Sequence, residues 1–291
     1  MAWPNRNGTL KNMSRPVAKP SLHRTDGDDD SGFRRILCGV DGSRPSREAV
    51  RQAVLLAGRG EIHFVAVSEV VGAGATRQAL LTPTRASQAL NDALADAREA
   101  GVAARTEIVS ASDPAKILLE RGFDFDLLVL GSHGRSRLQA ILVGTTAGVT
   151  LHRAAVPVWI ARPTVGASFP GPVLAATRAT PHDGPVVERA AHLAAHYDVP
   201  LTLVHVGAGS EAERHELAMQ CTRAQLIRGS EPVVIQEPGN PAERILESAT
   251  LLGAGLVVLG NGHRTGARAL VSVSERVAAH TPGSVLVLRG S

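Results

Sequence analysis

The sequence predicts an α/β fold made of two doubly wound parallel sheets, each with five strands. Short apolar runs alternate with amphipathic stretches of helical length, which favours parallel strands connected by helices. This alternation occurs twice along the 291 residues, a length that fits two ordinary domains. Aromatic residues make up only 3% of the chain, so we expect a core of Ala, Val and Leu between a sheet and helices on both of its faces.

The first half begins at Phe33, where apolar periodicity first appears in the sequence. Residues 1–32 lack apolar periodicity and are expected to form a disordered tail. Expected strands cover residues 35–40, 62–67, 105–109, 127–130 and 156–161, and expected helices cover 46–58, 85–100, 114–121 and 145–153.

The second half repeats this order. The matching segments are PAKILLE at 114–120 with PAERILE at 241–247, and LLVLG at 127–131 with LVVLG at 256–260. A repeat of this length indicates tandem domains rather than a solenoid. We place them at residues 33–164 and 171–291, joined by a segment rich in Pro and Gly.

The net charge of +4 raises the question of nucleic-acid binding. Lysine occurs only at Lys11, Lys19 and Lys116, and the arginines are scattered among acidic residues without aromatic neighbours. This pattern indicates a solvated surface, so we expect no nucleic-acid partner.

The cysteines and the hydropathy point to a cytoplasmic protein. Cys38 and Cys221 form no metal-binding or redox spacing, which favours a reducing compartment. The sequence contains neither an apolar run of membrane-spanning length nor the apolar core of a signal peptide, so no membrane partner is expected.

The stretch GSHGRSRLQAILVGTT at 131–146 follows the fourth expected strand directly. Open α/β sheets bind ligands beyond the carboxyl ends of their strands. Two glycines three residues apart allow backbone amides to approach an anion, and the third glycine with two threonines opens a helix whose N–H groups favour phosphate. The candidate phosphate contacts are therefore Gly131, Gly134, Gly144, Thr145 and Thr146.

A carboxylate follows the first strand at the same edge of the sheet. Residues 39–43 read Gly-Val-Asp-Gly-Ser. The Asp41 carboxylate can accept hydrogen bonds from a ribose or from a base amine across the crevice.

The spacing G-x2-G-x9-G-(S/T) after strand four, together with Val-Asp-Gly-Ser at 40–43, resembles the signature of the universal stress protein family. The resemblance covers about residues 33–290 and implies an adenine nucleotide alpha hydrolase-like fold, a strand order of 3-2-1-4-5, and ATP binding without a Walker A loop. Whether Mg²⁺ accompanies ATP stays open. By position, Asp41 would contact the adenine edge or ribose, and Gly39, Val40 and Ala66 would line the adenine slot. The phosphate loop would consist of Gly131, Ser132, His133, Gly134, Arg135, Gly144, Thr145 and Thr146.

The second half departs from this signature. His263 stands in the place of Gly134 and Val271 in the place of Gly144, and Arg178 stands where the first half has Asp41. A valine keeps its backbone farther from a ligand than glycine does, and an arginine reverses the charge. We expect this half to bind ATP weakly or not at all and to pack against the first half, as the fifth strand and its helix do in dimers of the family.

The function expected from these features is an ATP-binding regulatory or stress-response switch without catalytic residues or a metal site. It would act through a protein partner or through self-association, as an internal pseudo-dimer or a homodimer. Two alternatives remain: slow ATP hydrolysis, for which His133 is the candidate base, and a nucleotide-free scaffold.

Overall fold

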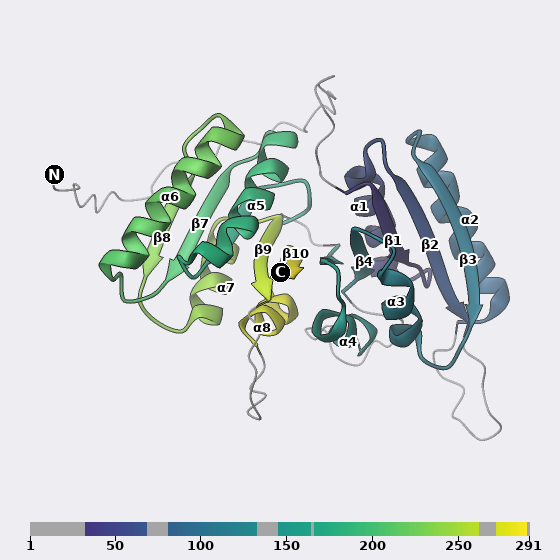
Figure 1. The fold of residues 1–291 in the computed structure, drawn as a ribbon. Helices are drawn as coiled ribbons and strands as arrows, with labels where there is room; N and C mark the ends of the chain where they lie inside the picture. The colour runs from purple at the N-terminus through teal and green to yellow at the C-terminus, as the bar shows by residue number, and fades with distance from the viewer. Residues whose placement is uncertain (1–32, 69–80, 133–144, 164–165, 262–271, 290–291) are drawn as a thin grey trace.

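The ten strands of the chain form a single sheet (Figure 1). The computed structural model describes residues 33–68, 81–132, 145–163, 166–261 and 272–289, so the expected tail at 1–32 lies outside the described residues. The strand order across the sheet is β3-β2-β1-β4-β5-β10-β9-β6-β7-β8.

The first half supplies strands β1 to β5 and helices α1 to α4. In chain order they are β1 (Arg35–Gly39), α1 (Arg44–Ala57), β2 (Glu61–Ser68), α2 (Pro83–Glu99), β3 (Ala103–Ser110), α3 (Pro114–Gly122), β4 (Leu127–Gly131), α4 (Thr145–Arg153) and β5 (Val158–Ala161).

The second half supplies the remaining elements. They are β6 (Val173–Thr177), the short 3-10 helix η1 (Pro181–Asp183), α5 (Gly184–His196), β7 (Leu201–Val206), α6 (Glu211–Arg228), β8 (Val233–Glu237), α7 (Pro241–Leu251), β9 (Leu256–Asn261), α8 (Val273–His280) and β10 (Ser284–Arg289).

The expected order 3-2-1-4-5 is confirmed in each half, as β3-β2-β1-β4-β5 and as β8-β7-β6-β9-β10. All strand pairs within a half are parallel. The two expected sheets are not separate, however, because β5 pairs with β10 in antiparallel register, with Trp159 opposite Leu286. This pairing, called the seam below, removes two open sheet edges whose N–H and C=O groups would otherwise lack partners.

Helices cover both faces of the continuous sheet. Side chains from α1, α2, α5 and α6 pack on one face in a single apolar cluster, and side chains from α3, α4, α7 and α8 pack on the other face. Successive residues of β1 alternate between the two clusters, as the period of a strand requires: Ile36 and Cys38 lie in the first and Leu37 in the second. This is the doubly wound arrangement that the sequence predicts.

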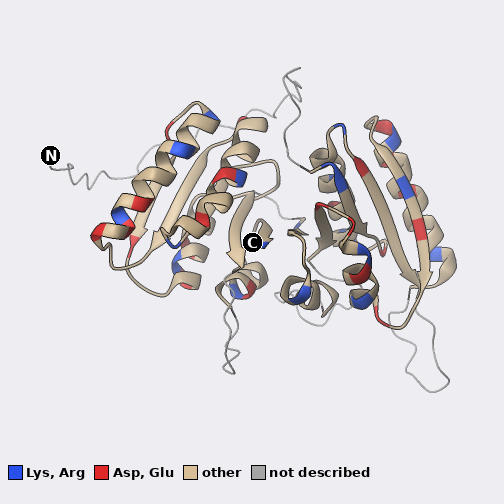
Figure 2. Cartoon of the chain, in the orientation of Figure 1, with Lys and Arg blue, Asp and Glu red and all other residues tan. Residues whose placement is uncertain are grey.

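The structure describes the cysteines, the distribution of surface charge and the hydropathy of the helices. Both cysteines are free, and burial raises the pKa of the Cys38 thiol. Figure 2 shows Lys and Arg interspersed with Asp and Glu along α2 and α6. Among the described helices, none has the length and apolarity that a bilayer span requires.

A buried polar network reinforces the seam from α1. The Gln52 side chain is fully buried, and its Oε1 accepts hydrogen bonds from Trp159 Nε1 at 2.6 Å and from Ser284 Oγ at 2.9 Å. Ser284 belongs to the second half, and its Oγ also accepts from the backbone N–H of Arg162 at 3.2 Å. One amide oxygen therefore connects a helix of the first half to the strands of both halves.

Replacing Gln52 tests this network. Gln52→Leu leaves the Trp159 N–H and the Ser284 hydroxyl buried without their acceptor, so we expect the free energy of unfolding to fall by about 2–4 kcal/mol in urea denaturation. The control is Gln88→Leu on the exposed face of α2, which we expect to change it by less than about 0.5 kcal/mol. Equal losses in the two variants would contradict the assigned role of Gln52.

Candidate functional site

The described part of the predicted site lies where β1, β2 and β4 end and where α4 begins. Gly39 and Gly131 are the last residues of β1 and β4, Ala66 lies near the end of β2, and Thr145 is the first residue of α4. Four predicted residues fall outside the described residues: His133, Gly134, Arg135 and Gly144.

Asp41 is held at the start of α1 by a tight turn. Its Oδ1 accepts from Ser43 N–H at 2.9 Å, and its own N–H donates to Ser46 Oγ at 3.0 Å. Gly42 makes the turn with a φ of 73°, a conformation that favours glycine, and Ser43 Oγ caps the helix by accepting from Ser46 N–H. Within the described part of the chain, Asp41 Oδ2 has no hydrogen-bond partner, and the residue is only partly buried. This oxygen remains available to a ligand.

Val40 and Ala66 lie in the core beneath α1 and α2. Their exposed fractions are 5% and 0%, and both belong to the apolar cluster that includes Ala89 of α2. A purine would therefore meet the edge of a packed apolar layer here. The contact with adenine stays a prediction.

Gly131 has a packing role that the sequence did not reveal. A Cβ at this position would lie 2.6 Å from the backbone carbonyl carbon of Pro45 and 2.8 Å from the backbone nitrogen of Ser46. The close approach that requires glycine here is thus made by the first turn of α1. Gly39 is also crowded, but by the side chain of Leu130, whose Cδ2 would lie 2.6 Å from the added Cβ.

The amide of Ser132 is already engaged. Its N–H donates to the carbonyl oxygen of Ala161 at 3.0 Å and extends the pairing of β4 with β5, and the residue is 1% exposed. The backbone N–H of Ser132 is therefore engaged within the sheet, and the contact of this residue with ATP stays a prediction. At the start of α4, Thr145 is exposed and Thr146 is partly buried. The first turn of this helix carries no acidic residue.

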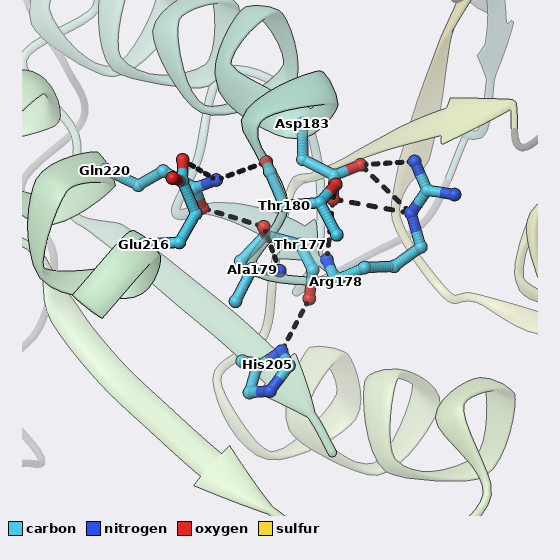
Figure 3. Close-up of polar contacts among 8 residues, drawn as sticks. All are labelled: Thr177, Arg178, Ala179, Thr180, Asp183, His205, Glu216 and Gln220. Atoms are coloured by element: carbon cyan, nitrogen blue, oxygen red, sulfur yellow. Dashed lines mark hydrogen bonds and ion pairs between the residues drawn. The ribbon is translucent and has the colours of Figure 1, made fainter. Parts of the chain in front are cut away.

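The second half closes the equivalent strand-end site with its own side chains (Figure 3). The repeat aligns Thr177 and Arg178 with Val40 and Asp41, and the strand registers then align His205 with Ala66. Thr177 replaces a valine of similar size with a polar residue, His205 replaces an alanine with a larger polar residue, and Arg178 reverses a charge.

Arg178 is neutralised by Asp183, which is buried at the start of α5. Arg178 Nη2 donates to Asp183 Oδ1 at 2.9 Å, and Arg178 N–H donates to Oδ2 at 3.1 Å. The carboxylate of Asp183 takes the place of the Ser46 hydroxyl and not that of Asp41. Asp183 follows Arg178 by five residues, as Ser46 follows Asp41, and each accepts from the equivalent backbone amide. Arg178 places a positive charge where the first half has the negative charge of Asp41, and the nearby carboxylate of Asp183 neutralises it.

The space next to this ion pair is filled by hydrogen-bonded side chains. Thr177 Oγ1 donates to Gln220 Oε1 at 2.7 Å, and Gln220 Nε2 donates to the carbonyl oxygen of Thr180 at 2.9 Å. The ring of His205, 1% exposed, places Nδ1 3.1 Å from the carbonyl oxygen of Thr177. Thr177 and Gln220 thus satisfy one another, while the buried Nε2 of His205 has no hydrogen-bond partner among the described residues.

The start of α8 is closed as well. Ser272 and Glu275 form a capping box, in which Ser272 Oγ accepts from Glu275 N–H at 3.2 Å and Glu275 Oε2 accepts from Ser272 N–H at 2.9 Å. Burial acts to raise the pKa of Glu275, but hydrogen bonds from Ser272 and His152 outweigh it and hold that pKa below its usual range. A carboxylate thus sits where an anion would bind, whereas α4 has none in its first turn.

Sequence comparison identifies the family of the chain. A sequence model described as the universal stress protein family matches residues 32–162 and again residues 171–289. The chain belongs to the universal stress protein family. The double match agrees with the tandem organisation of the ten-stranded sheet.

Several named universal stress proteins are similar in sequence. Rv2005c of Mycobacterium tuberculosis is 32% identical over 133 residues, covering 44% of this chain and 45% of that protein. Rv2623 of the same organism is 31% identical over 180 residues, covering 55% of this chain and 57% of that protein. The chain therefore spans about half the length of the curated relatives it matches.

Solved structures support the fold over most of the chain. A universal stress protein from Archaeoglobus fulgidus aligns with a TM-score of 0.68 at 20% identity, covering 88% of this chain and 98% of that one. One from Pseudomonas aeruginosa aligns with a TM-score of 0.68 at 21% identity, covering 89% and 94%. At these identities the likeness concerns the fold alone.

Two glycine substitutions separate packing from backbone freedom in the first half. Gly131→Ala would force its Cβ against the backbone of α1, so we expect a loss of about 2 kcal/mol or more in the free energy of unfolding. Gly148→Ala, inside α4 with no atom within 4 Å of the added Cβ, should instead raise it by about 0.5–1 kcal/mol. Thermal denaturation of both variants checks the pair, and an unchanged melting temperature for Gly131→Ala would refute the packing role.

Proposed function

We propose that the first half of this universal stress protein binds one ATP and that the protein acts as a nucleotide-dependent regulatory switch. The observation that carries the proposal is a difference between the described residues of the two halves. In the first half, Asp41 Oδ2 has no partner there and the first turn of α4 has no acidic residue, whereas in the second half Asp183 pairs with Arg178 and Glu275 caps α8.

The adenosine end of the ligand would lie beside Asp41. Its Oδ1 is used to fix the turn, so the side chain is oriented before any ligand arrives, and Oδ2 can accept from a ribose hydroxyl or the adenine amine. The apolar layer of Val40 and Ala66 would contact the purine edge.

The phosphates would lie at the start of α4. Thr145 and Thr146 offer hydroxyl donors there, and the positive end of the helix dipole favours an anion. Gly131 and Gly39 would shape this edge indirectly, by letting α1 and the side chain of Leu130 pack closely. His133, Gly134, Arg135 and Gly144 complete the proposed loop on the strength of the sequence signature.

Binding without rapid hydrolysis suits this set of residues. Asp41 is the carboxylate that the described part of the site presents, and it is committed to a turn. No group of three or more metal-ligating side chains occurs in the described residues, so any Mg²⁺ would arrive with the nucleotide. We place this switch in the cytoplasm, in keeping with two free cysteines, and propose that it signals through a protein partner or through self-association.

Calorimetric titration with ATP, with and without Mg²⁺, tests the proposal. We expect one ATP per chain, and we expect Asp41→Ala to weaken binding about tenfold or more, because a charge-assisted hydrogen bond is lost. Gly144→Val, which copies the valine of the second half, should weaken it as well.

Arg178→Ala is the matched control, since it alters the equivalent position of the second half and should leave the affinity unchanged. Unfolding curves confirm that each variant is folded. Two ATP per chain, or equal affinity in all the proteins, would contradict the assignment of the site to the first half.

A further inference from the structure

Two arginines occupy equivalent positions at the ends of β5 and β10. The pairing of β4 with β5 places Gly131 opposite Ala161, and the pairing of β9 with β10 places Gly260 opposite Leu288. Arg162 and Arg289 each follow by one residue. In both, the Nε atom is buried and lacks a hydrogen-bond partner among the described residues; Arg162 as a whole is buried and Arg289 is partly buried.

Each arginine crosses the seam and holds the last helix of the other half. Arg162 Nη2 donates to the carbonyl oxygens of Ala278 and Ala279 in α8. Arg289 Nη2 donates to the carbonyl oxygens of Thr150 at 3.1 Å and Leu151 at 2.6 Å in α4. Figure 1 shows α4 and α8 next to one another where the halves meet.

These contacts complement the negative ends of the two helix dipoles. Burial lowers the pKa of both arginines, that of Arg162 to about 10. A guanidinium group keeps its charge in proteins at neutral pH. Carbonyl groups in the last turn of a helix lack intrahelical donors, and a cation there stabilises the helix.

Helix α4 needs such an anchor more than a long helix would. It contains nine residues, a length at which an isolated helix is not stable in water. Thr145 and Thr146 at its other end are the proposed phosphate contacts, so the direction of their N–H and hydroxyl groups depends on the helix remaining formed and in place.

We propose that Arg289 is a positioning residue for the nucleotide site of the first half, supplied by the second half. It touches no ligand, and it fixes the carboxyl end of α4 so that the amino end meets the phosphates in a set geometry. The second half, with its own site closed, thus contributes to binding through one side chain. This role rests on the ATP site proposed above.

The test compares Arg289→Met with Arg162→Met. Both variants remove a guanidinium from the seam, but only the first releases α4. We expect calorimetry to show ATP binding weakened about three- to tenfold by Arg289→Met and unchanged within about twofold by Arg162→Met. Arg289→Lys, which keeps the charge, should restore part of the affinity.

Hydrogen exchange of the nucleotide-free proteins supplies a second measurement. Arg289→Met should speed exchange of the amides of residues 145–153, and Arg162→Met should speed exchange of 273–280 instead. Weaker binding without faster exchange in α4 would overturn the positioning role, and so would equal ATP affinities in the two methionine variants.

The two proposals fail in distinguishable ways. A wild-type protein that binds no ATP would overturn the proposed function and this role with it. A wild-type protein that binds ATP, with an affinity that Arg289→Met leaves intact, would overturn only the role of Arg289.

Discussion

The antiparallel pairing of β5 with β10 is the contact on which the other features depend. It brings Trp159 opposite Leu286 and joins two parallel sheets into one. Because the strands run in opposite directions, the two halves are related by an approximate two-fold rotation, and whatever follows one strand reaches the helix beside the other. The crossed contacts of Arg162 and Arg289 are a direct result of that geometry.

The approximate two-fold symmetry allows the strand-end turns of the two halves to be compared residue by residue. After the first strand of each half, a side chain accepts from a backbone amide at an equivalent position. Ser46 accepts from Asp41 N–H in the first half, and Asp183 accepts from Arg178 N–H in the second. Gly42 and Ala179 both take a positive φ in that turn, 73° and 54°. The two halves therefore share this backbone turn and differ in the side chains that it carries.

Alternation and periodicity predict parallel strands joined by helices and the start of α4 at Thr145, because both patterns act locally along the chain. The strand order within each half follows only from the resemblance to the universal stress protein family. The packing of the two halves through their fifth strands is expected only from dimers of the family, and the pairing of β5 with β10 confirms it. An apolar run such as Val158–Ala161 indicates burial on both faces but does not name the neighbouring strand. Gly131 shows a second limit: a missing Cβ serves a helix and a ligand equally well, and only the position of Pro45 separates the two. The ion pair of Asp183 with Arg178 could not be predicted from the sequence, because a separation of five residues matches neither the period of a helix nor that of a strand.

The second half also makes specific contacts with the first half across the seam. A domain without a ligand at its own strand ends can still contribute by stabilising the helices of its neighbour. His152 at the end of α4 pairs with Glu275 at the start of α8 at a distance of 3.0 Å, while Arg289 holds the last carbonyls of α4. Glu275 also caps the amino end of α8, so one carboxylate occupies the first turn of α8 and contacts the end of α4. The cap of α8 and the contact with α4 are thus linked through Glu275, whereas Arg289 contacts the carbonyl groups of α4.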